Sequence, residues 1–285
     1  MIDGSARRIA RARLPAFLFA ATILAILSPA LSAADTTLEY IIETRLPARE
    51  SSAATIWMTD GKVSLKSGGA KPARVIYWAK GDRLAMISDA KKSYIEMTGD
   101  EMREMAGSLD AMSGQMAAMM GSLTPEQKAM MDAQMKKMGV KGDGASARST
   151  EIEVLMLSET KMLQGFKCQK HDVIRGGAKS AEAWLTPAAD TTATSAEVIS
   201  MAGMTSLITL LLDSIGSMTK SIGLDLSLPT GLVRGMEGVP VYVKDLDGDA
   251  IRSEMTLQSL KRGKIDKSVF EIGDGYKKQD LSTTR

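Results

Sequence analysis

The sequence predicts an α+β protein built on a largely antiparallel sheet, and three observations lead to this prediction. Residues 38–97 alternate between apolar and polar in short runs separated by turn residues. The period then changes from about two to about 3.6 residues across a methionine-rich segment. Alternation returns after residue 150 and is interrupted once more by a helical pattern. We therefore expect six strands, a helical hairpin, three strands, a helix and about three further strands.

The first six strands are expected to form an antiparallel meander. Their separators are rich in glycine and aspartate, such as Asp60-Gly61 and Gly81-Asp82, which is typical of hairpin turns. Each run has one apolar and one polar face, which indicates a sheet with one face in water. The runs are LEYIIETRL, ATIWM, VSLKS, ARVIYWA, RLAMIS and KSYIEM.

The segment from about residue 98 to 138 is predicted to be a helical hairpin inserted between strands. From Met102, apolar side chains recur within an arc of about 100° at helical spacing. Thr124, Pro125 and Gln127 then form a capping box with proline at the first helical position, which marks a second helix. The stripe on the first helix consists of Met102, Met105, Leu109, Met112, Met116, Met119, Met120 and Leu123.

The rest of the chain is expected to return to strands around one more helix. EIEVLMLS, GFKCQKHDVI and AEAWLT come first, and GVPVYVKD, AIRSEMTLQSLKRG and SVFEIG come last. A helix is predicted from about Ser195 to Ile222, and its run MTSLITLLL is too short to span a membrane. The triad Asp245, Asp247 and Asp249 resembles a calcium loop but lacks the glycine and the final acid, so we interpret it as a hairpin turn.

The first 34 residues are typical of a secretory signal peptide. Four arginines precede an apolar run of about 17 residues from Pro15 to Leu31, and small residues follow. Cleavage is expected after Ala34 or one or two residues earlier, which places the mature protein in the periplasm. A retained membrane anchor is the less favoured alternative, because the run is short and contains Pro29.

Charge and cysteine content exclude two classes of protein. Without residues 1–34, the 36 basic residues become 32 and the 34 acidic residues become 33, for a net charge of −1. No basic stretch remains that would neutralise phosphates, so we expect no nucleic-acid binding. A single cysteine, Cys168, allows no disulfide within the chain.

The chain has few side chains suited to nucleophilic or acid–base catalysis, and we expect that it is not an enzyme. The chain has one histidine, His171, three residues after Cys168 in a predicted strand. An odd separation along a strand sends the two side chains to opposite faces, which disfavours a nucleophile and base pair. No G-x-S-x-G motif occurs, and carboxylate pairs cannot be recognised from sequence.

The methionines allow three interpretations. Thioethers are soft ligands that suit Cu(I), but copper sites of this kind usually add histidine or cysteine, and neither lies in this segment. Sacrificial oxidation is a further alternative. We favour an adaptable apolar surface, because methionine is unbranched and polarizable. The expected ligand-binding residues are Met102, Met105, Leu109, Met112, Met116, Met119, Met120, Ile208, Leu212 and Ile215.

Three segments together resemble a bacterial secreted domain-of-unknown-function family whose fold is similar to the periplasmic lipoprotein carriers (LolA/LppX-like). They are VIYWAKGDRLAMISDAKKSYIEM, then GFKCQKHDV with AEAWLTP, and finally GVPVYV leading to TLQSLKRGKIDKSVFEIGDGYKKQD. The resemblance implies a strongly curved antiparallel sheet, an unclosed barrel of about eleven strands, with the helices covering the concave face. It brings no catalytic residues, and the sequence departs from the family in the methionine-rich hairpin and in His171.

These inferences predict a single domain over residues 35–285 that binds a hydrophobic ligand without catalysis. The ligand would be a lipid, an acyl chain or an acylated protein, and a transient contact with the membrane is compatible with this role. No cofactor or metal is expected. The alternatives are a methionine-based Cu(I) binder and an envelope protein-interaction module, and the sequence leaves the oligomeric state open.

Overall fold

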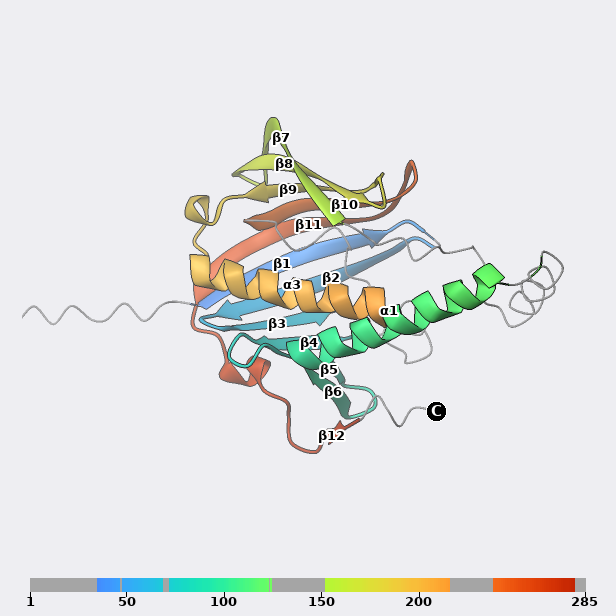
Figure 1. The fold of residues 1–285 in the computed structure, drawn as a ribbon. Helices are drawn as coiled ribbons and strands as arrows, with labels where there is room; N and C mark the ends of the chain where they lie inside the picture. The colour runs from blue at the N-terminus through green and yellow to red at the C-terminus, as the bar shows by residue number, and fades with distance from the viewer. Residues whose placement is uncertain are drawn as a thin grey trace, which may run out of the picture. The chain divides into compact units, whose positions relative to one another are not determined.

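The described part of the chain forms one twelve-stranded sheet with two long helices (Figure 1). The computed structural model describes residues 35–46, 48–68, 72–122, 124, 152–215 and 238–279. The strand order is β12-β6-β5-β4-β3-β2-β1-β11-β10-β9-β8-β7, and neighbours are antiparallel except β12 and β6. The outermost strands do not pair with each other, so the sheet is open within these residues. The α+β class and the antiparallel sheet are confirmed, with twelve strands where about eleven were expected.

The six-strand meander is confirmed, and each strand pairs with the next along the chain. Burial alternates along β1, where Leu38, Tyr40 and Ile42 are buried. Gly61 and Gly81 turn the chain with φ of +72° and +86°, which is left-handed backbone that favours glycine. The strands are β1 (Asp35–Thr44), β2 (Glu50–Thr59), β3 (Lys62–Ser67), β4 (Arg74–Trp78), β5 (Arg83–Ser88) and β6 (Ser93–Thr98).

The second half of the sheet is built from five further strands. A hairpin turn at Gly248 and Asp249 joins β10 to β11, as predicted for the aspartate triad. The whole length of β1 then pairs with β11, and this ladder joins the two halves of the sheet. The strands are β7 (Ile152–Leu163), β8 (Phe166–Arg175), β9 (Ala178–Thr186), β10 (Val239–Asp247) and β11 (Ala250–Gly263).

The prediction of a strand at SVFEIG was wrong. Residues Lys267–Phe270 form a 3-10 helix, η3, and Asp266 caps it by accepting a hydrogen bond from the Ser268 amide. This local side-chain bond gives the backbone an alternative to a sheet ladder. The last strand is instead β12 (Lys277–Lys278), which adds in parallel to the edge of β6.

Both long helices begin with a T-x-x-E capping box. Thr98 and Glu101 exchange side-chain to backbone hydrogen bonds of 2.6 and 3.2 Å at the start of α1 (Gly99–Ser122). Thr194 and Glu197 do the same at 2.7 and 3.2 Å at the start of α3 (Ser195–Ile215). A short 3-10 helix, η1 (Ala188–Asp190), precedes α3. Only Thr124 of the predicted second helix of the hairpin lies within the described residues.

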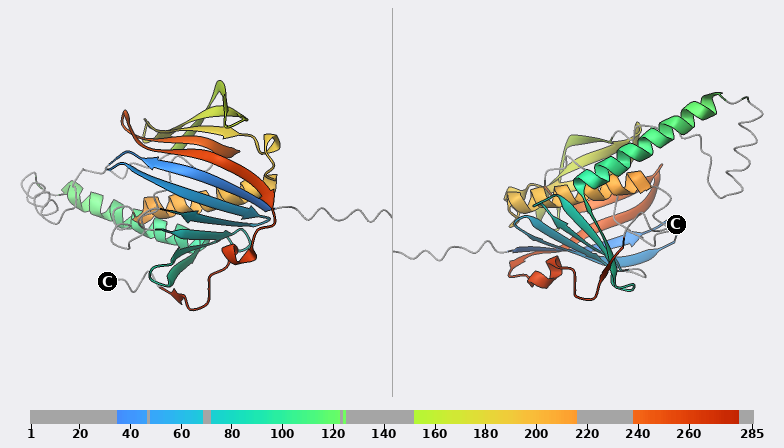
Figure 2. Two further views of the ribbon diagram at one scale, coloured as in Figure 1. Left: turned by 180° about the vertical axis from the view of Figure 1, so that it is seen from behind. Right: turned by 60° about the horizontal axis from the view of Figure 1, so that its bottom comes forward.

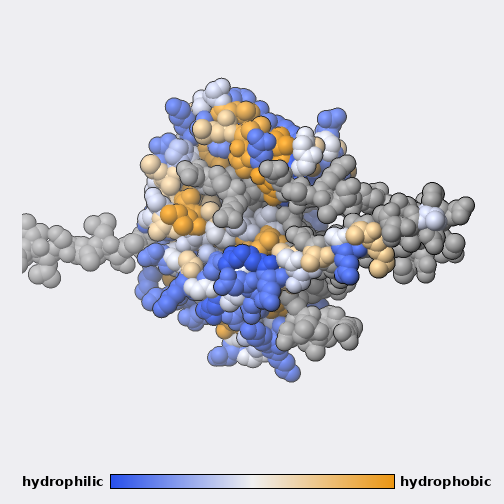
Figure 3. Space-filling model, in the orientation of Figure 1, coloured by the Kyte–Doolittle hydropathy of each residue, from blue (hydrophilic) through white to orange (hydrophobic). Residues whose placement is uncertain are grey.

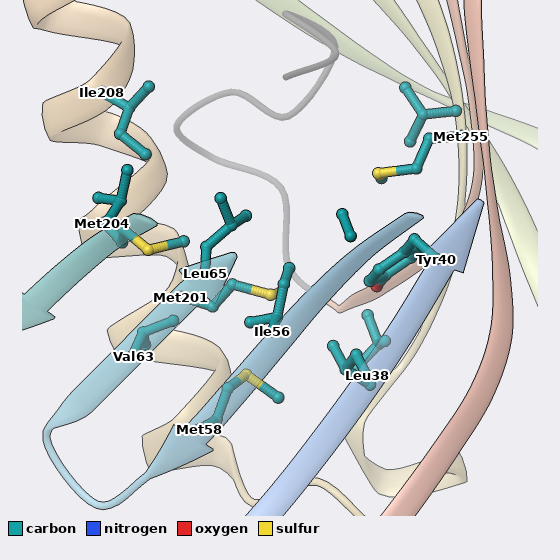
Figure 4. Packing of buried hydrophobic residues seen from close by; sticks show 14 of the residues in the cluster. Leu38, Tyr40, Ile56, Met58, Val63, Leu65, Met201, Met204, Ile208 and Met255 are labelled. Atoms are coloured by element: carbon teal, nitrogen blue, oxygen red, sulfur yellow. The ribbon is translucent and has the colours of Figure 1, made fainter. Parts of the chain in front are cut away.

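Helix α3 lies along one face of the sheet and packs against β2, β3, β4 and helix α1 (Figures 1 and 2). Figure 4 shows Met201, Met204 and Ile208 of α3 facing Leu65 and Ile56 of the sheet. No helix in the described ranges combines the length and hydropathy needed to cross a membrane. This arrangement puts a methionine-rich core between helix and sheet.

Candidate binding groove

A groove lies between the first half of α3 and strands β7–β9, and Gly238, just before β10, also lines it. Its volume is about 680 Å³, within the range of ligand pockets. The apolar part of its lining is Val154, Met156, Leu185, Pro187, Ala188, Val198, Ile199 and Ala202, and the polar side chains are Gln169, His171 and Ser195. Figure 3 shows hydrophobic side chains gathered on this face, in the region where Figure 1 draws β7 and β8.

Strand alternation decides which side chains of β7 and β8 reach the groove. Val154 and Met156 lie two residues apart in β7, and Gln169 and His171 lie two residues apart in β8, so each pair shares one face. Met156 is the Cα partner of His171 in the ladder. The groove face therefore carries apolar side chains on β7 beside amide and imidazole groups on β8.

Two polar side chains of the groove, Gln169 and His171, form hydrogen bonds with backbone carbonyls. The Nδ1 atom of His171 lies 3.1 Å from the Gln169 carbonyl oxygen, which accepts its proton in the Nδ1–H tautomer. That tautomer leaves Nε2 as an acceptor. The Gln169 side-chain amide donates a 3.0 Å hydrogen bond to the Leu157 carbonyl in the irregular part of β7. Its side-chain oxygen is an acceptor that can serve a ligand.

No lysine, arginine, aspartate or glutamate is among the lining residues that the structure describes. The opposite face of the same strands differs sharply. There the Lys170 ammonium lies 2.9 Å from Glu159 and 3.5 Å from Glu182. Charged pairs therefore collect on one face, and the groove face offers an apolar wall with a few neutral polar groups. Such a wall accepts an apolar ligand without a large desolvation cost.

The start of α3 is fixed to the sheet by a buried ion pair. The Glu197 carboxylate, 3% exposed, accepts hydrogen bonds from Thr36 at 3.1 Å and from the Arg262 guanidinium at 3.0 Å. Arg262 also donates to the Thr192 carbonyl just before the helix. These contacts join α3 to β1 and β11 and set the position of the helical wall of the groove.

The structure brings three of the predicted ligand-binding residues together in the core. Met102 is fully buried, Ile208 is 4% exposed, and Met105 packs against the same cluster. None of these three lines the groove. Met119 is 60% exposed. The side chains of Leu109, Met112, Met116, Met120, Leu212 and Ile215 lie outside the described residues. Their role in ligand binding, and the copper alternative, stay predictions.

The sequence reasoning missed the residues that do line the groove. Their signal was the apolar run in IEVLMLS, which is too apolar for a strand with one wet face, followed by Gln169 and His171 at a spacing of two. The sequence does not show that the first turns of α3 lie opposite these strand residues. That juxtaposition comes from the strand order, which places β9 and β10 between β8 and β11.

The lone thiol lies in the core. Cys168 is fully buried, and its Sγ donates a 3.4 Å hydrogen bond to the Phe166 carbonyl. Burial raises the pKa of this thiol, which keeps it protonated at neutral pH. Within the described ranges, no three histidine, cysteine, aspartate or glutamate side chains gather as a metal site would require.

Comparison with known proteins finds distant structural similarity alone. No family model and no curated protein matches the sequence. Two crystal forms of PNGF-II match at 10% and 9% identity, with TM-scores of 0.40 and 0.39. Each match covers 88% of this chain and 32% of PNGF-II, so this chain spans about a third of that protein. An uncharacterized conserved protein from Thermus thermophilus matches at 5% identity with a TM-score of 0.43, covering 87% of this chain and 91% of that one. The resemblance to lipoprotein carriers therefore stays a prediction.

Proposed function

We propose that this chain is a periplasmic, non-enzymatic binding protein whose groove between α3 and β7–β9 holds a lipid or acyl chain. The observation that carries the proposal is the composition of the groove, which has about 680 Å³ of space and a largely apolar, uncharged wall. Ligand pockets of this size are typically apolar with a few polar groups that fix orientation. Here His171 and Gln169 would orient a hydroxyl, amide or ester group at the head of the ligand.

The methionines under α3 support the same function. Met201 and Met204 hold the helix on the sheet with Met58 and Met102 in the same core cluster. Methionine side chains repack at low cost because they are unbranched and have three rotatable bonds. These side chains can therefore rearrange around ligands of different length while the contact between Glu197 and Arg262 keeps the start of α3 in place. The acyl chain of an acylated protein would enter the groove beside Ile199, because this side chain is 70% exposed and marks an open side.

The experiment is a titration with a fluorescent palmitoyl probe, followed by competition with unlabelled fatty alcohols and phospholipids. Ala202→Phe fills the groove, and we expect it to weaken probe binding about tenfold or more, equivalent to about 1.4 kcal/mol. Leu155→Phe is the matched control, because Leu155 precedes Met156 and points to the other face of β7. Absence of saturable binding by the parent protein, or equal loss in both variants, would contradict the proposal.

A further inference from the structure

Strand β7 is an outer edge that the described chain leaves uncovered. Among the described residues it pairs with β8 alone, and nine of its twelve residues, Ile152–Met156 and Thr160–Leu163, have partners there. The opposite edge of the sheet is different, because β12 adds to β6 there. Outer strands are usually short or protected by lysine and proline. This one is long, has no proline and a single lysine, Lys161, and exposes 40% of Leu155, 68% of Met156 and 64% of Met162.

The side chains of β7 keep the same two faces before and after an irregular stretch in the middle of the strand. Val154 and Met156 face the groove, whereas Glu159, Lys161 and Leu163 line the charged pocket on the opposite face. The ladder with β8 is irregular between Met156 and Thr160, but an even number of residues is inserted, so the alternation is kept. Val154 and Met156 before the irregular stretch, and Thr160 after it beside Gln169, therefore share the groove face, and Glu159, Lys161 and Leu163 share the charged face.

We propose that a second copy of this chain pairs antiparallel with β7 through a twofold axis at Leu157. A twofold axis perpendicular to a sheet keeps each face on its own side, so even-numbered residues must meet even-numbered ones. In this register Glu153 lies opposite the partner's Lys161, and the symmetry makes that pair twice. On the groove face Ile152 lies opposite the partner's Met162, also twice. Glu153 and Lys161 are both exposed, so each is accessible to a partner strand.

The neighbouring registers lack this complementarity. A shift by two residues in one direction sets Glu153 opposite the partner's Glu159, and directly opposed like charges destabilise a sheet. A shift in the other direction sets Glu153 opposite the partner's Leu163. Opposed ion pairs and apolar pairs, together with the backbone hydrogen bonds, favour the register centred on Leu157. The pairing would give one continuous sheet with both grooves on the same face, and it does not depend on the proposed ligand.

A charge-exchange experiment tests both the interface and its register. The full chain purified from its host is examined by sedimentation equilibrium, and we expect a concentration-dependent dimer. Glu153→Lys and Lys161→Glu each place like charges opposite one another, so each should raise the dimer dissociation constant about tenfold or more. The double variant with both substitutions restores opposite charges and should dimerise like the parent.

Controls separate the interface from folding. Lys66→Glu on β3 reverses an exposed charge far from this edge in the strand order and should leave the dimer unchanged. Thermal unfolding of each variant reports whether the fold is intact. The proposal is overturned if the parent stays monomeric up to about 100 μM, if folded single variants dimerise like the parent, or if the double variant fails to recover.

Discussion

Helix α3 meets the two halves of the sheet in different ways. Toward β2–β4 it packs closely, and Gly203 is part of the reason, since a Cβ there would lie 2.6 Å from the Tyr77 hydroxyl. Toward β7–β9 the neighbouring residue Ala202 borders open space. One helix thus serves as a core element on one side and as the wall of a groove on the other. A binding site arises here without loss of core, because the two tasks fall on different faces of the helix.

The closely packed side also carries a hydrogen bond that holds Tyr77 in place. Its hydroxyl donates to the Asp82 carboxylate at 3.1 Å. Burial and the negative charge of Asp82 raise the pKa of Tyr77 to about 12, so the phenol stays protonated across the physiological range. On the hollow side, where α3 borders the groove, the hydrogen bonds of Gln169 and His171 run to backbone carbonyls and not to a carboxylate.

The largest effect is expected from breaking the anchor that fixes α3 to both halves. Arg262→Met leaves the buried Glu197 carboxylate without its cation, and we expect a loss of about 3–5 kcal/mol in the free energy of unfolding. Urea denaturation measures the loss. The double variant Arg262→Met with Glu197→Gln should lose less, since no charge is then left unpaired. Equal losses in both would show that the charge of Glu197 is unimportant.

A smaller effect is expected on the packed side of the helix. Met204 is 2% exposed, and Met204→Ala should cost about 2–4 kcal/mol through lost burial and a residual cavity. Met204→Leu keeps the volume and should cost less than about 1.5 kcal/mol. Denaturant midpoints of the two variants provide the comparison. A cost below about 1 kcal/mol for the alanine variant would mean that this side of α3 is not closely packed.

The smallest effect on stability is expected on the hollow side. Ile199 is 70% exposed, so Ile199→Ser should change the free energy of unfolding by no more than about 0.5 kcal/mol. The same variant removes an apolar contact at the groove and should weaken binding of the palmitoyl probe. A large loss of stability would contradict the division between a packed and a hollow side.

Local chemistry made most of the elements predictable from the sequence. Alternation and turn residues predicted β1 to β6, and helical spacing predicted α1 and α3. The prediction of a strand at SVFEIG was wrong because it rested on alternation alone. The Asp266 side chain accepts a hydrogen bond from the Ser268 amide, and this cap favours a 3-10 helix. The capping boxes at Thr98 and Thr194 could have been read from the sequence in the same way as the one at Thr124.

The site was harder to predict because its residues meet through tertiary structure. The stripe beginning at Met102 was expected to face a ligand, yet Met102 itself is a core residue. Helical spacing identifies an apolar face but does not say what covers it. His171 was considered for catalysis and as a departure from the family pattern, whereas in the structure it lines the groove together with Met156 from β7 and Val198 from α3. Such neighbours depend on strand order, which periodicity does not encode.

The pairing of β1 with β11 affects how the chain reaches its fold. Asp35 lies beside Gly263 and Thr44 beside Ser253, so the central ladder joins segments more than 200 residues apart. Closing such long loops costs entropy before any contact compensates, which makes folding slow in proteins of this topology. The meander can form early, but β1 keeps an unpaired flank with half of its ladder missing until β11 arrives. We therefore expect the protein to be most exposed to aggregation and proteolysis while β11 is not yet paired.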